Sequence, residues 1–247
     1  MTNVLSNKIA LVTGSSRGIG AAIAKKLASH GAHVAVVYGK SKDEADKVVE
    51  AITSAGGKAR AYHADATKPA TMAALADAVK KDLGPIDILV NNAGVFNNGL
   101  IGETDYAAYE RDRSINMDTV FALTNAVVPQ MKNGGRIINI SSVLGERSLM
   151  PGLSVYNATK FAVNGFTRSW ARDLAPKGIL VNAVQPGPID TDMNPATGEF
   201  ADAQRANVPL GRYGKPEEIA GAVAFLAGPD ATFVTGTTIT VDGGSIA

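Results

Sequence analysis

The sequence predicts an α/β fold in which one doubly wound parallel sheet of seven strands carries helices on both faces. Short apolar, β-branched runs alternate with longer amphipathic runs along the chain, a pattern typical of parallel strands joined by helical crossovers. The run at residues 86–90 is almost continuously apolar, as expected for a strand buried on both faces. No linker or repeat interrupts the pattern, so we expect a single domain over residues 1–247.

Each element is expected where its own periodicity is strongest. Strands are predicted where apolar and β-branched residues stand together, at residues 9–13, 34–38, 59–63, 86–90, 136–140, 179–184 and 237–241. Helices are predicted where apolar residues recur at helical spacing, at residues 18–30, 42–54, 70–83, 106–131, 155–174 and 216–226. Ser41 and Glu44 have the spacing of a capping box. Residues 186–214 lack periodicity and are rich in Pro, Gly, Asp and Asn, which predicts a substrate loop or lid.

Composition excludes several classes of function. The formal net charge is +1 and 19% of residues are charged, which gives no electrostatic footprint for nucleic acid or membranes. No apolar run reaches the ~20 residues needed to span a bilayer, and residues 1–8 lack the apolar core of a signal peptide. The chain has no Cys, and its three His form no metal-binding pattern. We therefore expect a cytoplasmic protein without a metal site.

A glycine-rich turn joins the first predicted strand to the first helix. It contains Gly14, Gly18 and Gly20, with Ser16, Arg17 and Ile19 between them. Glycines allow the backbone to approach a pyrophosphate, and a helix N-terminus favours its charge. A tight loop without a ligand is the alternative, but the position between strand and helix favours phosphate binding.

The residues after the second strand favour NADP(H) over NAD(H). An acidic residue at this place would bind a ribose 2′-hydroxyl and repel a 2′-phosphate. Here the strand ends with Tyr38, followed by Lys40 and Ser41 and no acid. Arg17 and Lys40 are both candidates to face the phosphate, although Lys40 is also compatible with a solvated turn residue.

Two further turns are candidate parts of the same crevice. Asp65 follows the third strand, where it could bind an adenine amine or serve a local turn. Asn92, Ala93 and Gly94 follow the fourth strand, and small residues and amides at a central strand end suit a ligand crevice.

Tyr156 and Lys160 stand four residues apart, which places them on one face of a helix. A free phenol has a pKa near ~10, too high for efficient proton transfer at neutral pH. An ammonium about 4 Å away contributes roughly 4 kcal/mol at an effective dielectric of about 20. We therefore expect Lys160 to lower the pKa of Tyr156. An amphipathic helix surface is the alternative for the pair taken alone.

The glycine cradle, the Asn-Asn-Ala-Gly turn and the Tyr-x3-Lys pair occur in this order and together resemble the short-chain dehydrogenase/reductase family over essentially the whole chain. The chain is most similar to its bacterial members that include 3-oxoacyl-carrier-protein reductases. This resemblance implies a Rossmann-type fold and usually a homotetramer.

The resemblance also implies roles for individual residues. Tyr156 acts as proton donor in reduction, and Lys160 lowers its pKa and binds the nicotinamide ribose. Ser142 hydrogen-bonds the substrate oxygen, and Asn116 holds a water of a proton relay. Ser141 is a second choice for the serine, because Ser142 and Tyr156 are one residue further apart than is typical.

The segment after the sixth strand resembles the family's nicotinamide-binding segment. Pro186, Gly187, Ile189 and Thr191 are its candidate contacts, with a turn-rich loop as the alternative. We expect substrate specificity to lie in residues 186–214, 96–98 and 148–153.

The function expected from these residues is NADPH-dependent reduction of a ketone or aldehyde to an alcohol. One alternative is 3-oxoacyl-carrier-protein reduction, which the short and weakly basic loop at residues 131–136 makes less favourable. An alternative of another class is a nucleotide-binding or signal-sensing protein for a cyclic dinucleotide. The intact Tyr156 and Lys160 pair argues against a pure binder.

Overall fold

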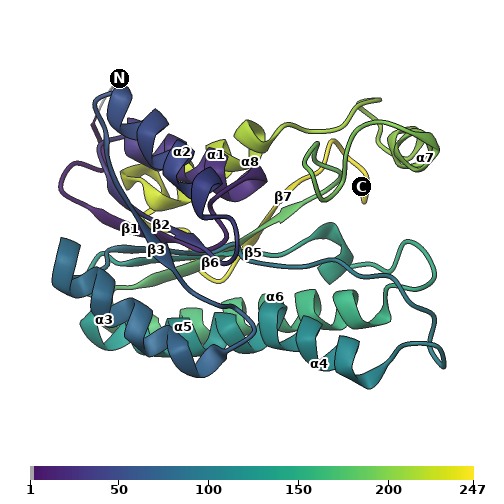
Figure 1. The fold of residues 1–247 in the computed structure, drawn as a ribbon, viewed down its shortest axis with the longest axis horizontal. Coiled ribbons are helices and arrows are strands. Elements are labelled where there is room, and N and C mark those ends of the chain that lie inside the picture. Colours follow the sequence, from purple (N-terminus) through teal and green to yellow (C-terminus); the bar gives the residue numbers. More distant parts are fainter. Residues whose placement is uncertain (1–2) are drawn as a thin grey trace.

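A computed structural model describes residues 3–247, and its centre is one sheet of seven parallel strands (Figure 1). The strands lie in the order β3-β2-β1-β4-β5-β6-β7, which confirms the predicted fold class. Their bounds are β1 Ile9–Val12, β2 His33–Tyr38, β3 Lys58–His63, β4 Ile88–Asn91, β5 Arg136–Ile140, β6 Leu180–Pro186 and β7 Thr238–Val241.

Helices cover both faces of the sheet, and each helical layer closes its own apolar core (Figure 1). One layer is formed by α1 (Gly18–Ser29), α2 (Lys42–Ser54) and α8 (Pro216–Ala227). The other layer is formed by α3 (Met72–Leu83), α4 (Tyr106–Arg113), α5 (Thr119–Val127) and α6 (Ser154–Leu174). Within residues 3–247, none of these helices has the length and apolarity needed to cross a bilayer.

The order of the strands creates a crevice at the carboxyl ends of β1 and β4. The chain first builds the sheet outward through β2 and β3 and then returns to add β4 on the other side of β1. Val12 pairs with Val36 on one side and with Val90 on the other, so all three strands end at one edge. Ligands bind at such switch points, because the two adjacent turns diverge there.

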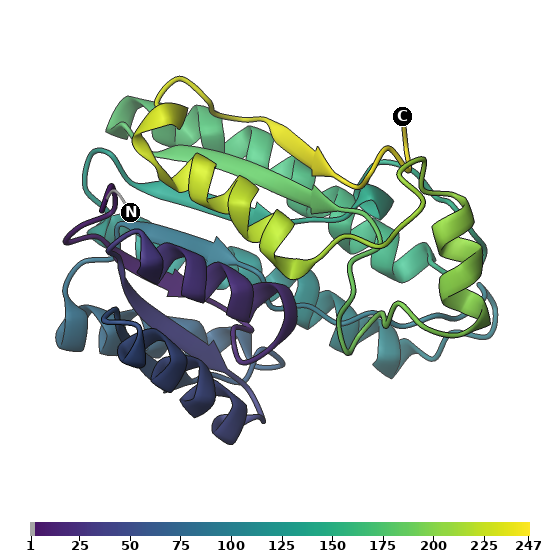
Figure 2. The same cartoon turned by 90° about the horizontal axis from the view of Figure 1, so that it is seen from above.

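Two elements differ from the sequence prediction. The helix predicted at 106–131 is interrupted by a π-helical turn at Ser114–Asp118 and ends in a 3-10 turn at Val128–Gln130. The 186–214 segment contains a short helix, α7 (Glu199–Ala206), which stands beyond the end of the sheet (Figure 2). Ala201 is the one buried residue of α7. A helix with so small a buried face has little apolar periodicity, so the sequence did not predict it.

Helix α1 approaches the crevice so closely that Gly20 has no room for a side chain. A Cβ at Gly20 would lie 2.5 Å from Asn92 Nδ2 and would also overlap the Gly14 carbonyl oxygen. Gly20 is inside α1, where Ala would otherwise be the better helix former.

We therefore expect Gly20→Ala to destabilise the protein by about 1–3 kcal/mol, because the overlap outweighs the gain in helix propensity. Urea denaturation measures the change. Gly221→Ala is the matched control, since Gly221 is inside α8 with no atom within 4 Å of an added Cβ. That control should be neutral or stabilising by up to about 1 kcal/mol. Equal effects of the two substitutions would contradict the close approach.

Candidate active site

The turn after β1 is hydrogen-bonded directly to the turn after β4. Thr13 Oγ1 accepts from the backbone amides of Asn92 and Ala93, each at 2.9 Å. In return, Asn92 Nδ2 donates to the carbonyl oxygens of Thr13 at 2.8 Å and Gly14 at 3.1 Å. Gly14 has a φ of +61°, and a Cβ there would lie 2.9 Å from Ala93 Cα. Sequence reasoning did not single out Thr13. Its position directly before Gly14 in the glycine-rich turn was the signal that could have identified it.

The N-terminus of α1 presents amide groups to this crevice. Its N-cap is Arg17, whose side chain makes no capping hydrogen bond, and its first turn contains no acidic residue. The amides of Gly18, Ile19 and Gly20 therefore form a partially positive helix end. Ser16 is half-buried in the preceding turn. The bare backbone at Gly14 and this helix end fit the pyrophosphate of a dinucleotide.

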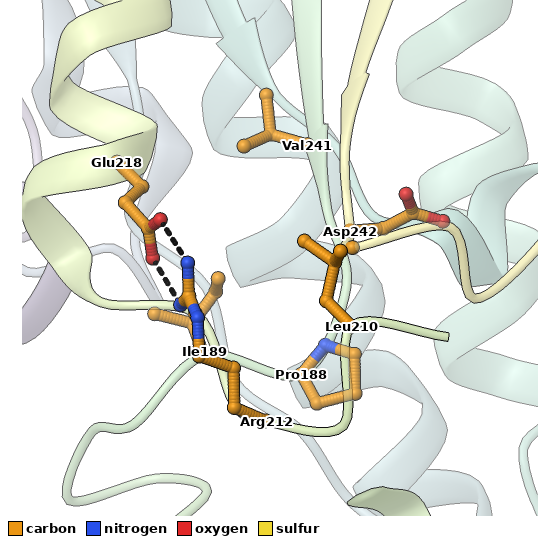
Figure 3. Close-up of a pocket in the computed structure, with 9 residues that line it drawn as sticks. Pro188, Ile189, Leu210, Arg212, Glu218, Val241 and Asp242 are labelled. Atoms are coloured by element: carbon orange, nitrogen blue, oxygen red, sulfur yellow. Dashed lines mark hydrogen bonds and ion pairs between the residues drawn. The ribbon is translucent and has the colours of Figure 1, made fainter. Parts of the chain in front are cut away.

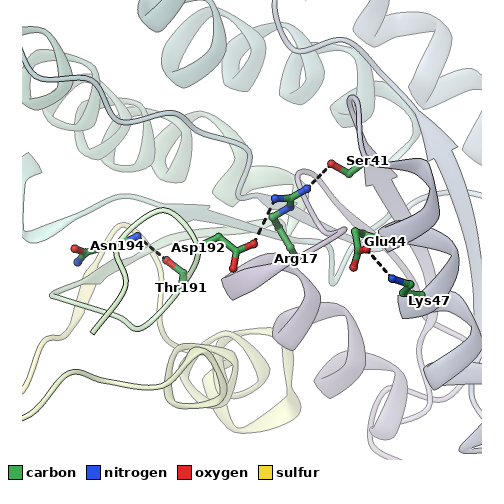
Figure 4. Close-up of polar contacts among 7 residues, drawn as sticks. All are labelled: Arg17, Ser41, Glu44, Lys47, Thr191, Asp192 and Asn194. Carbon is green, nitrogen blue, oxygen red and sulfur yellow. Dashed lines mark hydrogen bonds and ion pairs between the residues drawn. The ribbon is translucent and has the colours of Figure 1, made fainter. Parts of the chain in front are cut away.

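Arg17 extends from the glycine cradle to the start of α2. Its Nη2 donates to Ser41 Oγ at 2.6 Å, and its Nη1 lies 3.3 Å from Asp192 Oδ2 (Figure 4). The predicted capping box is wrong, because Ser41 accepts from Arg17 and makes no capping hydrogen bond. Glu44 instead pairs with Lys47 at 2.8 Å. Lys47, and to a lesser extent Arg17, lower the pKa of Glu44.

The other residues predicted around the adenosine end lie at the ends of β2 and β3. Tyr38 packs edge-on against His63 with ring centroids 5.6 Å apart, and Lys40 is exposed in the following turn. Asp65 accepts from the backbone amide of Thr67 at 3.0 Å and from its hydroxyl at 2.7 Å. These hydrogen bonds lower the pKa of Asp65 and give it a local turn role.

The serine at the end of β5 that faces the tyrosine is Ser142. Its Oγ accepts from the backbone amide of Leu144 at 3.1 Å, and its side chain is close enough to the Tyr156 phenol to lower the pKa of that phenol. Ser141 Oγ instead donates to the Lys160 carbonyl oxygen at 3.3 Å. Of the two serines considered from the sequence, the geometry therefore brings Ser142 to the phenol.

Burial dominates the protonation of the Tyr156 and Lys160 pair. Desolvation raises the pKa of Tyr156 to about 12, with the Ser142 hydrogen bond opposing it. The net shift is opposite to the one that the sequence predicts. The reason is that the Lys160 ammonium donates to the Ile140 carbonyl at 2.9 Å and stands 5.6 Å from the Tyr156 ring centroid. Desolvation also lowers the pKa of Lys160 to about 8.

Asn116 lies in the π-helical turn and is 1% exposed. Its side chain pairs with the backbone of Val95, accepting from the amide at 2.8 Å and donating to the carbonyl at 2.9 Å. It also donates to Thr159 Oγ1 at 3.3 Å. A Cβ at Gly94 would lie 3.3 Å from Asn116 Oδ1 and 3.7 Å from Lys160 Nζ, so Asn116 shapes the floor beside the amine. Sequence reasoning did not identify Val95 as its partner.

Aromatic and polar residues extend the site away from the cradle. The Phe96 ring packs edge-on against Tyr156 with centroids 5.0 Å apart. A cavity of about 160 Å³ lies alongside, and its lining includes Asn97, Asn98 and Gly152. These residues belong to the segments from which the sequence predicts specificity.

The segment after β6 is held over the end of the sheet. Pro186 ends β6, and the amide of Asp190 donates to the Gly214 carbonyl at 2.9 Å. Gly187 has no room for a side chain, because a Cβ there would meet Asp242 at 2.6 Å. A Cβ at Gly18 would lie 3.4 Å from Thr191 Cγ2, which places Thr191 over the α1 N-terminus.

A small cavity of about 50 Å³ lies under this segment, with Pro188 and buried Ile189 in its wall (Figure 3). It is closed on one side by Arg212, which donates to both carboxylate oxygens of Glu218 at 2.8 and 2.7 Å. The cavity is small, and Tyr156 is not among the residues that line it, so it is no substrate site. Among residues 3–247 no cluster of metal-ligating side chains is present.

The chain resembles known proteins over almost its whole length. The family model described as enoyl-(acyl carrier protein) reductase matches residues 14–245. A short-chain dehydrogenase from Burkholderia cenocepacia, solved in complex with NADP, is 44% identical with a TM-score of 0.97, and the match covers 99% of this chain and 100% of that one.

Two curated relatives carry different names. The 3-oxoacyl-(acyl-carrier-protein) reductase FabG of Staphylococcus epidermidis is 42% identical over 96% of this chain and 98% of its own length. The cyclic-di-GMP-binding biofilm dispersal mediator protein of Escherichia coli is 42% identical over 96% of this chain and 97% of its own length. With the cradle, the Tyr156 and Lys160 pair and the NADP-bound neighbour, the chain belongs to the short-chain dehydrogenase/reductase family and is an NADP-dependent oxidoreductase.

Proposed function

We propose that this chain is a carbonyl reductase in which Tyr156 gives a proton to the oxygen of a ketone or aldehyde. The observation that carries the proposal is the half-buried Tyr156 phenol, which has Ser142 close enough to affect its pKa and the Lys160 amine 5.6 Å from its ring centroid. Bound NADPH supplies the hydride to the carbonyl carbon. A phenol with a pKa of about 12 is protonated at neutral pH, so Tyr156 carries the proton that this reaction needs.

The remaining side chains have supporting roles in this proposal. Ser142 holds the carbonyl oxygen next to the phenol and stabilises its developing charge. The alkoxide that forms is a far stronger base than a phenolate, so proton transfer from Tyr156 is downhill. Lys160, charged below pH about 8, stabilises the resulting phenolate. The Asn116 side chain is already hydrogen-bonded to the Val95 backbone. In this proposal the backbone carbonyl of Asn116 therefore holds the relay water.

The alternatives share the scaffold and differ in ligand. Similarity to the Staphylococcus epidermidis reductase favours a 3-oxoacyl thioester as one member of the substrate class. Acetoacetyl thioester reduction tests this directly. Similarity to the Escherichia coli mediator protein motivates calorimetry with a cyclic dinucleotide. Cyclic dinucleotide binding without turnover of any carbonyl or alcohol would replace the reductase proposal with a sensor.

We expect Tyr156→Phe to lower the rate of NADPH oxidation by about 10²–10⁴-fold across a panel of ketones and aldehydes, because the proton donor is removed. Absorbance at the NADPH band measures the rate. NADPH binding and the far-UV circular dichroism spectrum should be retained. Tyr106→Phe, at an exposed tyrosine of α4, is the matched control and should leave the rate unchanged. A loss of only a few-fold in Tyr156→Phe would exclude the proton role.

We expect Lys160→Met to abolish most activity yet stabilise the fold at pH 7. Burial lowers the pKa of Lys160 from 10.5 to about 8. Holding its ammonium at pH 7 therefore costs about 3 kcal/mol. Loss of the hydrogen bond to the Ile140 carbonyl offsets about 1 kcal/mol of this. We therefore expect the variant to have a free energy of unfolding about 2 kcal/mol higher than the wild type.

The stability difference should depend on pH in one direction. Between pH 8 and 10.5 the unfolded chain binds the Lys160 proton and the folded chain does not. Wild-type stability therefore rises with pH in this window, and its gap to Lys160→Met closes. Urea denaturation at pH 7 and near pH 10 measures the gap. A gap of constant size would show that the amine is not desolvated.

A homotetramer is part of the proposal because α5 and α6 carry an aromatic patch made of Phe121, Phe166 and Trp170. The Phe166 and Trp170 rings stack 4.8 Å apart, with Phe121 within 6.4 Å of both. Phe121 is 52% exposed and the other two rings are half-buried, and an aromatic cluster that reaches the surface is typical of subunit contacts.

We expect Phe121→Glu to lower the mass measured by light scattering at micromolar concentration, because it places a charge in that contact. Ile101→Glu makes the same change at a side chain that is 89% exposed in a loop and should leave the mass unchanged. A wild-type monomer, or no response to Phe121→Glu, would remove this contact from the proposal.

A further inference from the structure

The Arg17 side chain links the 186–214 segment to the adenosine side of the crevice. Asp192 Oδ2 lies 3.3 Å from Arg17 Nη1, and Arg17 Nη2 donates to Ser41 Oγ at 2.6 Å (Figure 4). These three side chains come from the segment after β6, the glycine cradle and the start of α2. They form a chain of polar contacts across the mouth of the crevice.

A folded turn presents Asp192 to Arg17. The amide of Asn194 donates to the Thr191 carbonyl at 3.0 Å, and the amide of Ala196 donates to Asp190 Oδ1 at 2.9 Å. Asn194 Nδ2 also donates to Gln204 Oε1 at 3.1 Å, which ties the turn to α7. The position of the Asp192 carboxylate is therefore coupled to the whole segment.

Within residues 3–247, Asp192 is the carboxylate that forms an ion pair with Arg17. Glu44, the other acid in the field of Arg17, is bound to Lys47 at 2.8 Å. The Arg17 and Asp192 side chains are 53% and 74% exposed, so a competing anion can reach both of them. A guanidinium binds a phosphate dianion more strongly than a single exposed carboxylate, because the phosphate carries more charge and matches the planar fork.

We propose that Asp192 is a displaceable internal anion, which occupies Arg17 until the 2′-phosphate of NADP(H) takes its place. Displacement frees the turn at residues 190–196, so recognition of the 2′-phosphate is transmitted to the substrate segment. NAD(H) lacks this phosphate and leaves the ion pair intact. The inference rests on the NADP(H) cofactor and is independent of which carbonyl compound is reduced.

The first test measures dissociation constants for NADPH and NADH by fluorescence titration. Asp192→Asn should tighten NADPH binding by about 1.5- to 5-fold, the range for an exposed ion pair, and leave NADH binding unchanged. The gain should shrink at 1 M salt, where exposed charges are screened. Glu199→Gln removes the same charge from exposed α7 and is the matched control, with no change for either cofactor.

A double-mutant cycle assigns the effect to the ion pair. Arg17→Ala should weaken NADPH binding by about 10-fold or more, because it removes a charge-assisted contact with the phosphate. Adding Asp192→Asn to Arg17→Ala should then change nothing further. Tightening of both cofactors by Asp192→Asn, or weaker NADPH binding in that variant, would overturn displacement.

Hydrogen exchange supplies a readout that does not depend on activity. In the cofactor-free protein, Asp192→Asn should speed amide exchange at residues 190–196 relative to wild type. Adenosine 2′-monophosphate should have the same effect on the wild-type protein, whereas adenosine 5′-monophosphate should not. Equal effects of the two nucleotides would overturn the proposal. Failure of carbonyl reduction with this exchange pattern intact would count against the proposed reaction alone.

Discussion

The contact between the turns after β1 and β4 is the constraint on which the site depends. Thr13 and Asn92 exchange four hydrogen bonds with the opposite turn, and Gly14 packs against Ala93 where no side chain fits. This contact fixes where the β1 turn enters α1, so it determines where the helix amides point. It also fixes the start of the segment from Gly94 onward, which reaches the amine and the phenol.

Desolvation is the second physical theme, because it acts on the two central ionisable groups in opposite directions. It keeps the Tyr156 phenol protonated and lowers the affinity of Lys160 for its proton. Both shifts favour neutral side chains. At neutral pH Lys160 is nevertheless charged, and its buried ammonium lowers the stability of the folded protein. Such a site is less stable than an apolar one and more reactive, which is the usual compromise of catalytic groups.

Sequence reasoning predicted the fold because strands buried on both faces and amphipathic helices leave strong periodic signals. It identified Ser142, Tyr156 and Lys160, which the structure brings together, because their order along the chain follows a known pattern. It failed where tertiary contacts override local spacing. Ser41 accepts from Arg17 in place of capping α2, and the Lys160 amine points to a carbonyl. The contact between Arg17 and Asp192 joins residues 175 positions apart, so no local sequence pattern predicts it.

The π-helical turn at Ser114–Asp118 has a consequence for how this helix can evolve. A wide turn adds one residue without breaking the helix, and each residue rotates an α-helix by about 100°. The faces of α4 and α5 are therefore out of phase, so α5 contacts α3 and β4 while α4 contacts α6. Loss of a single codon there would restore a regular helix and swing Asn116 away from Val95. The number of residues in this one turn therefore determines the geometry of the pocket floor, and an in-frame deletion there would alter the site without touching any side chain that lines it.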